Sequence, residues 1–164
     1  MFKILLSLPL VVFASAAAAE GRPTPETAFA KSAFVALHSL PRPANDIDAS
    51  LSYFASADAF AEFVRTSRAT PFTGVASVAD ISVTYDFVEG TDAFSVGKGM
   101  PDGSVAVMFN VVQHVKASGR EADNCFAVSA IVQSEPLGIR GLATGFSLEG
   151  METRPIPLAD CQAK

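Results

Sequence analysis

The sequence predicts an α+β fold in which two or three N-terminal helices pack on a curled antiparallel sheet of about five strands. Two observations lead to this prediction. Apolar residues recur at helical spacing before residue 75, whereas from Asp80 onward they alternate with polar ones, as in strands that bury one face. Pro- and Gly-containing turns separate the segments. The helices of the first half are therefore the expected cover for the apolar face of the sheet.

The first 19 residues have the three-part order of an export signal. Lys3 is the only charge, an apolar run extends from Ile4 to about Phe13, and small residues end at Ala19. The apolar run is shorter than the roughly 20 residues that span a bilayer, which disfavours an uncleaved anchor. We expect residues 1–19 to be cleaved, residues 20–164 to form a single domain, and the protein to be periplasmic or secreted without a stable membrane anchor.

The chain has two cysteines, Cys125 and Cys161. An exported protein meets an oxidising environment, so these two predict a disulfide that fastens the C-terminal tail, residues 154–164, to the body of the domain. Neither has a second Cys or His at ligand spacing, which argues against a metal site. Free or reactive thiols remain the alternative, although no neighbouring base is visible in the sequence.

The size, charge and composition of the chain limit the functions that it can have. Subtracting the leader leaves 164 − 19 = 145 residues, the size of one domain with a substantial core. The remaining 11 basic and 17 acidic residues give a net charge of −6, which argues against nucleic acid as a partner. Phe residues are numerous and Trp is absent, so the aromatic residues mostly predict a core.

Three helices are expected before residue 75. Thr24 offers a capping hydroxyl and Pro25 suits the first helical position, so the first helix should cover 25–39. A short second helix follows over about 46–54 with Asp46 as its cap, and a third begins after Ser56. Pro and Gly in the segment TPFTG end the third helix.

Five strands are expected from Asp80 onward. Residues 81–87 form the first, 89–92 turn the chain, and the second returns from residue 93. The sequence PDGS at 101–104 favours a hairpin that leads into a long third strand. A turn at 119–123 precedes the fourth strand at 125–133, and the fifth covers about 139–148. Gly141 and Gly145 suggest a bend in the sheet.

The segment NDIDASLSYF at 45–54, followed by long strands around a DG hairpin, resembles the nuclear transport factor two-like group of cone-shaped domains over about residues 25–149. The resemblance implies a roll of sheet and helices. The cystatin-like roll is a second relative by shape, since QHVKA at 113–117 is similar to its Q-x-V-x-G protease-binding loop, with Ala117 at the Gly position.

Two imidazoles are available for chemistry. His38 lies in the last turn of the first helix, where a structural role is expected. His114 shares one face of the third strand with Asn110, and a curled sheet would bring both near Thr84 or Asp86 of the first strand. His114 would then act as a base oriented by Asp86. The alternative is a solvated polar face, because antiparallel sheets commonly expose one side to water.

No cofactor or metal site is predicted. The sequence contains no His pair at metal-binding spacing, and ASGREAD lacks the glycines of a phosphate-binding loop. Asp46 and Asp48 are interpreted as capping residues rather than calcium ligands, because no further ligand residues follow them.

Three functions remain open. The first is an exported binding or accessory module, without catalysis, for a small apolar ligand or a protein partner. The second is a small pocket enzyme, a hydrolase or isomerase, that uses His114 and Asp86 with Asn110 nearby. The third is a cystatin-like protease inhibitor.

Overall fold

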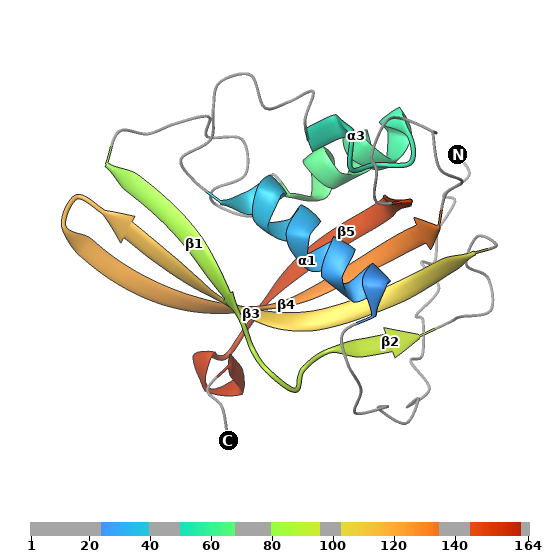
Figure 1. Cartoon of the computed structure of the whole chain (residues 1–164). Helices are drawn as coiled ribbons and strands as arrows, with labels where there is room; N and C mark the ends of the chain where they lie inside the picture. Colours follow the sequence, from blue (N-terminus) through green and yellow to red (C-terminus); the bar gives the residue numbers. More distant parts are fainter. Residues whose placement is uncertain (1–23, 40–49, 68–79, 96–102, 135–144, 162–164) are drawn as a thin grey trace, which may run out of the picture.

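The computed structural model describes residues 24–39, 50–67, 80–95, 103–134 and 145–161. In these residues two helices pack against one five-stranded antiparallel sheet, which confirms the predicted α+β class (Figure 1). The elements in chain order are α1 (Pro25–His38), α3 (Ala57–Ser67), β1 (Ile81–Phe87), β2 (Ala93–Ser95), β3 (Ser104–Ala117), β4 (Arg120–Ser134), β5 (Phe146–Ile156) and the 3₁₀ helix η1 (Leu158–Cys161).

Helix α1 begins and ends as the sequence predicts. The Thr24 hydroxyl accepts a hydrogen bond from the backbone N–H of Thr27 at 3.2 Å, and Pro25 occupies the first turn. The extended backbone of Ser39 ends the helix. The start of the predicted second helix lies outside the described residues, and Ser50 and Leu51 have helical conformation. The third predicted helix is confirmed by α3. It also begins with a capping residue, since Ser56 Oγ accepts a hydrogen bond from the Ala59 N–H at 3.1 Å.

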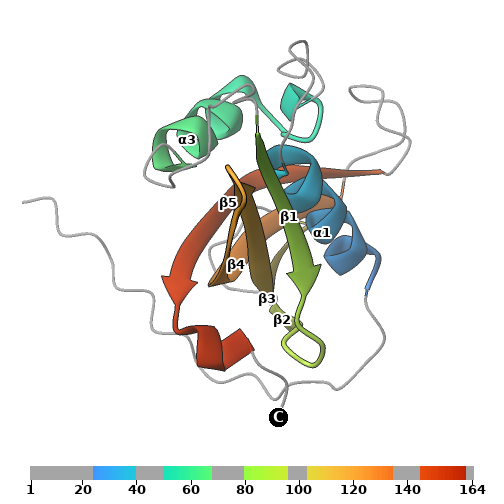
Figure 2. The same ribbon diagram turned by 90° about the vertical axis from the view of Figure 1, so that its left-hand side faces the viewer.

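The sheet has the strand order β1-β3-β4-β5, and β2 also pairs with β3. Strands β3 and β4 form a long hairpin through Ser118 and Gly119, both of which have positive φ. The long strands bend towards the side on which α1 lies (Figure 1). Figure 2 shows α1 beside β1, with η1 and α3 at opposite ends of the molecule. The tight turn makes β4 begin at Arg120, five residues earlier than predicted.

The predicted return of the second strand against the first is wrong. Strands β1 and β2 both pair antiparallel with β3, so they follow each other along the same edge instead of forming a hairpin. Between them, Gly90 has a φ of 74° and the chain makes an outward loop. The Thr91 hydroxyl accepts a hydrogen bond from the Asn110 N–H at 2.9 Å, and this side-chain bond takes the place of a ladder bond.

The predicted fifth strand was placed too early in the chain. Strand β5 extends to Ile156, so the first three residues of the segment interpreted as a tail, 154–156, pair with β4. Pro155 lies within β5, which is an edge strand of the sheet, where the missing N–H of a proline is tolerated. The predicted part from residue 139 to 144 lies outside the described residues.

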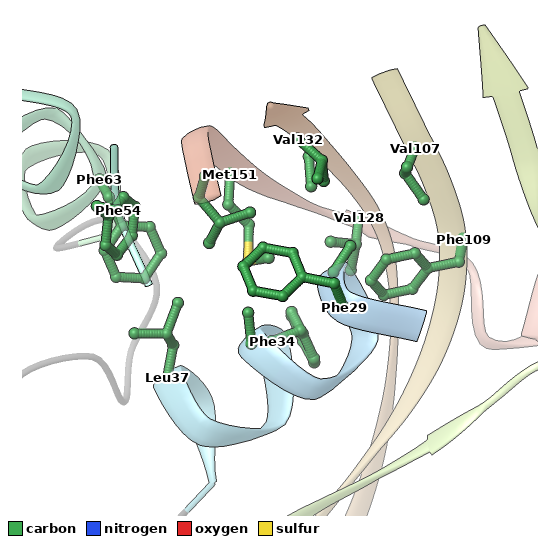
Figure 3. Close-up of a cluster of buried hydrophobic side chains, with 14 of the residues drawn as sticks. Phe29, Phe34, Leu37, Phe54, Phe63, Val107, Phe109, Val128, Val132 and Met151 are labelled. Carbon is green, nitrogen blue, oxygen red and sulfur yellow. The ribbon is translucent and has the colours of Figure 1, made fainter. Parts of the chain in front are cut away.

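The main core fills the space between the sheet and the helices (Figure 3). The Phe34 ring packs edge-on against Phe109 of β3 and Tyr85 of β1, with centroid distances of 5.9 and 4.8 Å. Full burial of such a side chain stabilises the fold by about 1.5–3 kcal/mol. The largest fully buried side chains are Phe34, Phe54, Phe109, Leu37, Leu148, Val83, Val107, Val111, Val128 and Val132. The alternation of β3 therefore directs its odd-numbered residues to the helices.

Candidate functional site on the outer face of the sheet

The outer face is the side of the sheet opposite α1. From residue 106 onward it carries the even-numbered side chains of β3, which are half-buried or exposed: Ala106, Met108, Asn110, Val112, His114 and Lys116. A second, small core forms on this face where η1 packs, and it consists of Val88, Val112, Cys125, Ile156 and Cys161. In Figure 1, η1 lies below the sheet and α1 above it.

The predicted disulfide between Cys125 and Cys161 is present. The two Cα atoms are 5.9 Å apart, and 2% and 6% of the residues' surfaces are exposed. Because both sulfurs are bonded and buried, the alternative of a reactive thiol is wrong for this structure. The bond fastens η1 to the outer face of β4, so the chain end adjoining β5 is fixed.

His114 contacts two carboxylates from two neighbouring strands. Its Nε2 lies 3.0 Å from Oδ2 of Asp86 on β1, and its Nδ1 lies 2.8 Å from Oδ1 of Asp123 on β4. The register explains both contacts, since Asp123 lies directly opposite His114 and Asp86 follows Thr84, the other opposite residue, by two positions. The sequence offered Asp86 and Thr84 as possible partners of His114, with a solvated polar face as the alternative.

Asp123 was missed because it was assigned to a turn. The sequence signal was weak, since Asp123 and Asn124 are both polar and interrupt the alternation of the fourth strand. A two-residue turn at Ser118 and Gly119 would have placed Asp123 opposite His114.

The surroundings of His114 favour its protonated form. The hydrogen bond with Asp123 raises the pKa of His114, partial burial opposes this rise, and the hydrogen bond with Asp86 adds to it. The geometry agrees, because an imidazolium donates from both nitrogens whereas a neutral ring donates from one. A general base needs a ring nitrogen that is free to accept a proton, and here each nitrogen faces a carboxylate oxygen.

The cluster is open to solvent. The side chain of His114 is 35% exposed, that of Asp123 is 52% exposed and that of Asp86 is 81% exposed. Asn110 lies four residues along β3, about 13 Å away at the rise of a strand, so it does not join the cluster directly. Its backbone instead holds the loop between β1 and β2 through Val88 and Thr91.

His38 is a core residue. It is 5% exposed, its ring stacks on Phe34 with centroids 4.3 Å apart, and its Nδ1 lies 2.9 Å from the Phe34 carbonyl oxygen. An Nδ1–H at this position donates to the Phe34 carbonyl, and together with burial and ring stacking this supports the expected structural role.

A line of polar side chains crosses the inner face. Gln113 Nε2 donates to the Tyr85 hydroxyl at 2.9 Å, and Gln113 Oε1 accepts from Asn124 Nδ2 at 3.0 Å. Gln113 is buried, and the segment QHVKA pairs with β1 on one side and β4 on the other. The cystatin-like motif therefore lies within a central strand and not in an exposed loop.

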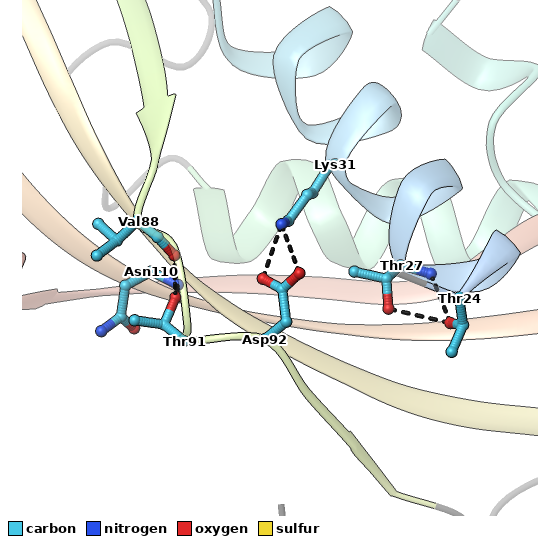
Figure 4. A network of polar contacts seen from close by, with 7 residues as sticks. All are labelled: Thr24, Thr27, Lys31, Val88, Thr91, Asp92 and Asn110. Carbon is cyan, nitrogen blue, oxygen red and sulfur yellow. Dashed lines mark hydrogen bonds and ion pairs between the residues drawn. The ribbon is translucent and has the colours of Figure 1, made fainter. Parts of the chain in front are cut away.

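An ion pair that the sequence did not indicate joins α1 to the start of β2 (Figure 4). Lys31 Nζ lies 2.7 Å from both carboxylate oxygens of Asp92, and it also lies 5.1 Å from the ring centroid of Phe87. The side chains of Lys31 and Asp92 are 20% and 30% exposed, so the pair is partly shielded from water. It fixes the loop after β1 against the helix.

Two further findings concern only the parts of the chain that the structure describes. No group of three or more His, Cys, Asp or Glu side chains within 24–39, 50–67, 80–95, 103–134 and 145–161 is arranged to hold a metal ion. Over the same ranges, no helix combines the length and the apolar character needed to cross a bilayer.

Known proteins share this fold at low sequence identity. No family model and no curated protein matches the sequence. An IcmL-like type IV secretion system protein of Legionella pneumophila is 16% identical, with a TM-score of 0.61 over 79% of this chain and 90% of that one. A periplasmic fragment of TraM is also 16% identical, with a TM-score of 0.59 over 80% and 96%.

CagV of Helicobacter pylori, a VirB8 homolog of a type IV secretion system, is 13% identical, with a TM-score of 0.54 over 79% of this chain and 99% of that one. At these identities the likeness establishes a shared fold. The chain thus shares its α+β fold with these three proteins.

Proposed function

We propose that this chain is an exported accessory module that binds another protein outside the cytoplasm and has no catalytic role. The observation that carries the proposal is the shared fold. Matched structures described as a periplasmic fragment of TraM and the periplasmic domain of DotI are covered over 96% and 92% of their length. The roll is thus similar to nearly the whole of those domains.

The disulfide supports the compartment. A buried bond between Cys125 and Cys161 forms and persists under oxidising conditions, as in the periplasm or outside the cell. The export signal predicted at residues 1–19 is consistent with that location. Cleavage before Glu20 would release residues 20–164 as the functional unit.

A protein partner is favoured over a small apolar ligand by how the roll is filled. The concave side of the sheet is occupied by aromatic and aliphatic side chains, including the fully buried Phe34, Phe54 and Phe109. A ligand would have to displace this packing. The outer face and the outer sides of the helices are surfaces that a second protein can reach without such a change.

The alternative function, a small pocket enzyme, remains a prediction that substitution of His114 tests. The contact between His114 and Asp86 exists, but both ring nitrogens are engaged and the cluster is solvent-exposed. His114→Ala should leave partner binding by a module intact, whereas an enzyme that depends on this imidazole would lose turnover.

Site-specific photo-cross-linking in the native host tests the proposal. A photoreactive residue at Ser129, which lies opposite Met108 on the outer face, probes that surface, and one at the exposed Ala61 of α3 probes the helical side. We expect one position to give a discrete adduct with a single envelope protein, identified by mass spectrometry. The buried Val128 serves as the matched negative control. Absence of a discrete adduct at both surface positions would contradict the proposal.

A further inference from the structure

We propose that Asp86, His114 and Asp123 form a proton-dependent clasp that holds β1 and β4 to β3 on the outer face, and that loss of one proton from His114 loosens the edge strand β1. The clasp is defined by the two contacts of 3.0 and 2.8 Å between the imidazole and the carboxylates. It joins three adjacent strands through one side chain.

The position of β1 makes it sensitive to this contact. It is the edge strand of the path β1-β3-β4-β5, and Asp86 is the one charged residue in its sequence, ISVTYDF. Its other outer-face side chains, Ser82 and Thr84, are short hydroxyls. On the inner face of β1, Val83 and Tyr85 pack in the core. The clasp therefore adds a contact on the outer face of a strand whose inner face is already packed.

The charged groups near the clasp are paired with each other or exposed to solvent, so the charges that act on His114 are those of its two carboxylates. Lys116 of β3 and Glu121 of β4 lie next to it on the outer face and pair with each other at 2.8 Å. Asp160 of η1 and Asp80 before β1 are exposed. Asp123 and Asp86 are the groups whose charges act on His114.

The neutral state weakens one of the two contacts. A neutral imidazole has one N–H and one lone pair, so one nitrogen would face a carboxylate oxygen without a proton between them. The attraction of an imidazolium for both carboxylates would also be lost. Asp86 is the more exposed carboxylate and the one with the longer contact, so its side chain is the one expected to turn into solvent.

The direction of the pH dependence follows from linkage. The pKa of His114 in the folded protein is raised above its value in the unfolded chain. The stabilisation is therefore fully present below a pH of about 6.5 and is lost as the pH rises through the folded pKa.

Amide exchange and NMR titration of His114 test the clasp in the purified protein. After correction for intrinsic exchange, protection of the β1 amides should fall about fivefold from about pH 5 to about pH 9, the scale of a partly exposed ion pair. In His114→Gln, whose amide does not titrate, the corrected profile should be flat. Lys116→Gln is the matched control on the same face and should keep the wild-type profile.

The carboxylates supply a second, independent readout. Asp86→Asn and Asp123→Asn should each lower the pKa of His114, and Asp123→Asn should have the larger effect because its bond contributes most. Both sites are exposed, so these variants are expected to fold. A His114 pKa at or below the ordinary 6.5, or the same corrected exchange profile in the wild type and His114→Gln, would overturn the proposal.

Discussion

At the scale of single residues, alternation along a strand carries much of the information about the candidate site. It placed His114 on the face opposite the core and predicted its contact with Asp86. Alternation did not predict the contact of His114 with Asp123. Asp123 was assigned to a turn, and strand register depends on the geometry of that turn. Lys31 and Asp92 are separated by 61 residues, and no local pattern connects them.

Thr91 is the residue whose hydroxyl replaces a backbone group in the sheet. It accepts from the Asn110 N–H at 2.9 Å and donates to the Val88 carbonyl oxygen at 2.8 Å. Thr91→Val keeps the shape but removes both bonds, so the free energy of unfolding should fall by about 1–3 kcal/mol. Chemical denaturation measures this change.

Thr91→Ser is the matched control because it keeps the hydroxyl and loses one methyl group. The serine variant should be closer to the wild type than the valine variant. Equal stability of Thr91→Val and the wild type would show that the hydroxyl does not support the loop between β1 and β2.

At the scale of elements, the sequence predicts whether a segment is a helix or a strand better than it predicts where that element ends and which strand it pairs with. Helix α1 matches because capping residues define its start, and β3 matches because its alternation is long and regular. The pairing partner of β2 was not predictable. A loop that contains Gly90 allows β2 either to form a hairpin with β1 or to continue along the same edge of β3. The end of β5 was missed because residues 154–164 were interpreted as a tail, whereas β5 is an edge strand and tolerates Pro155.

The disulfide is the strongest single tie between η1 and the sheet. It closes a loop with a sequence separation of 36, so reduction should lower the free energy of unfolding by roughly 4 kcal/mol on the loop-entropy estimate. Denaturation with and without reductant measures the change. The double variant Cys125→Ala/Cys161→Ala should match the reduced protein and should not respond to reductant. Unchanged stability of the wild type after verified reduction would contradict this role.

At the scale of the whole molecule, the fold class followed from the order of elements. Helices that precede an antiparallel sheet have to cover its apolar face, and this requirement leads to a roll. The fold is shared with the three matched structures at 13–16% identity, which explains why no sequence motif pointed to them. Packing demands only apolar character and volume at core positions, so a fold persists after its sequence has diverged.

The central claim is that the chain works outside the cytoplasm as a disulfide-closed module. Intact mass spectrometry of the protein from its native host, with thiol alkylation before and after reduction, tests it most directly. We expect an N-terminus at Glu20, no alkylation before reduction and two alkylated cysteines, Cys125 and Cys161, after it. A chain that retains Met1 and is alkylated at both cysteines without reduction would contradict the claim.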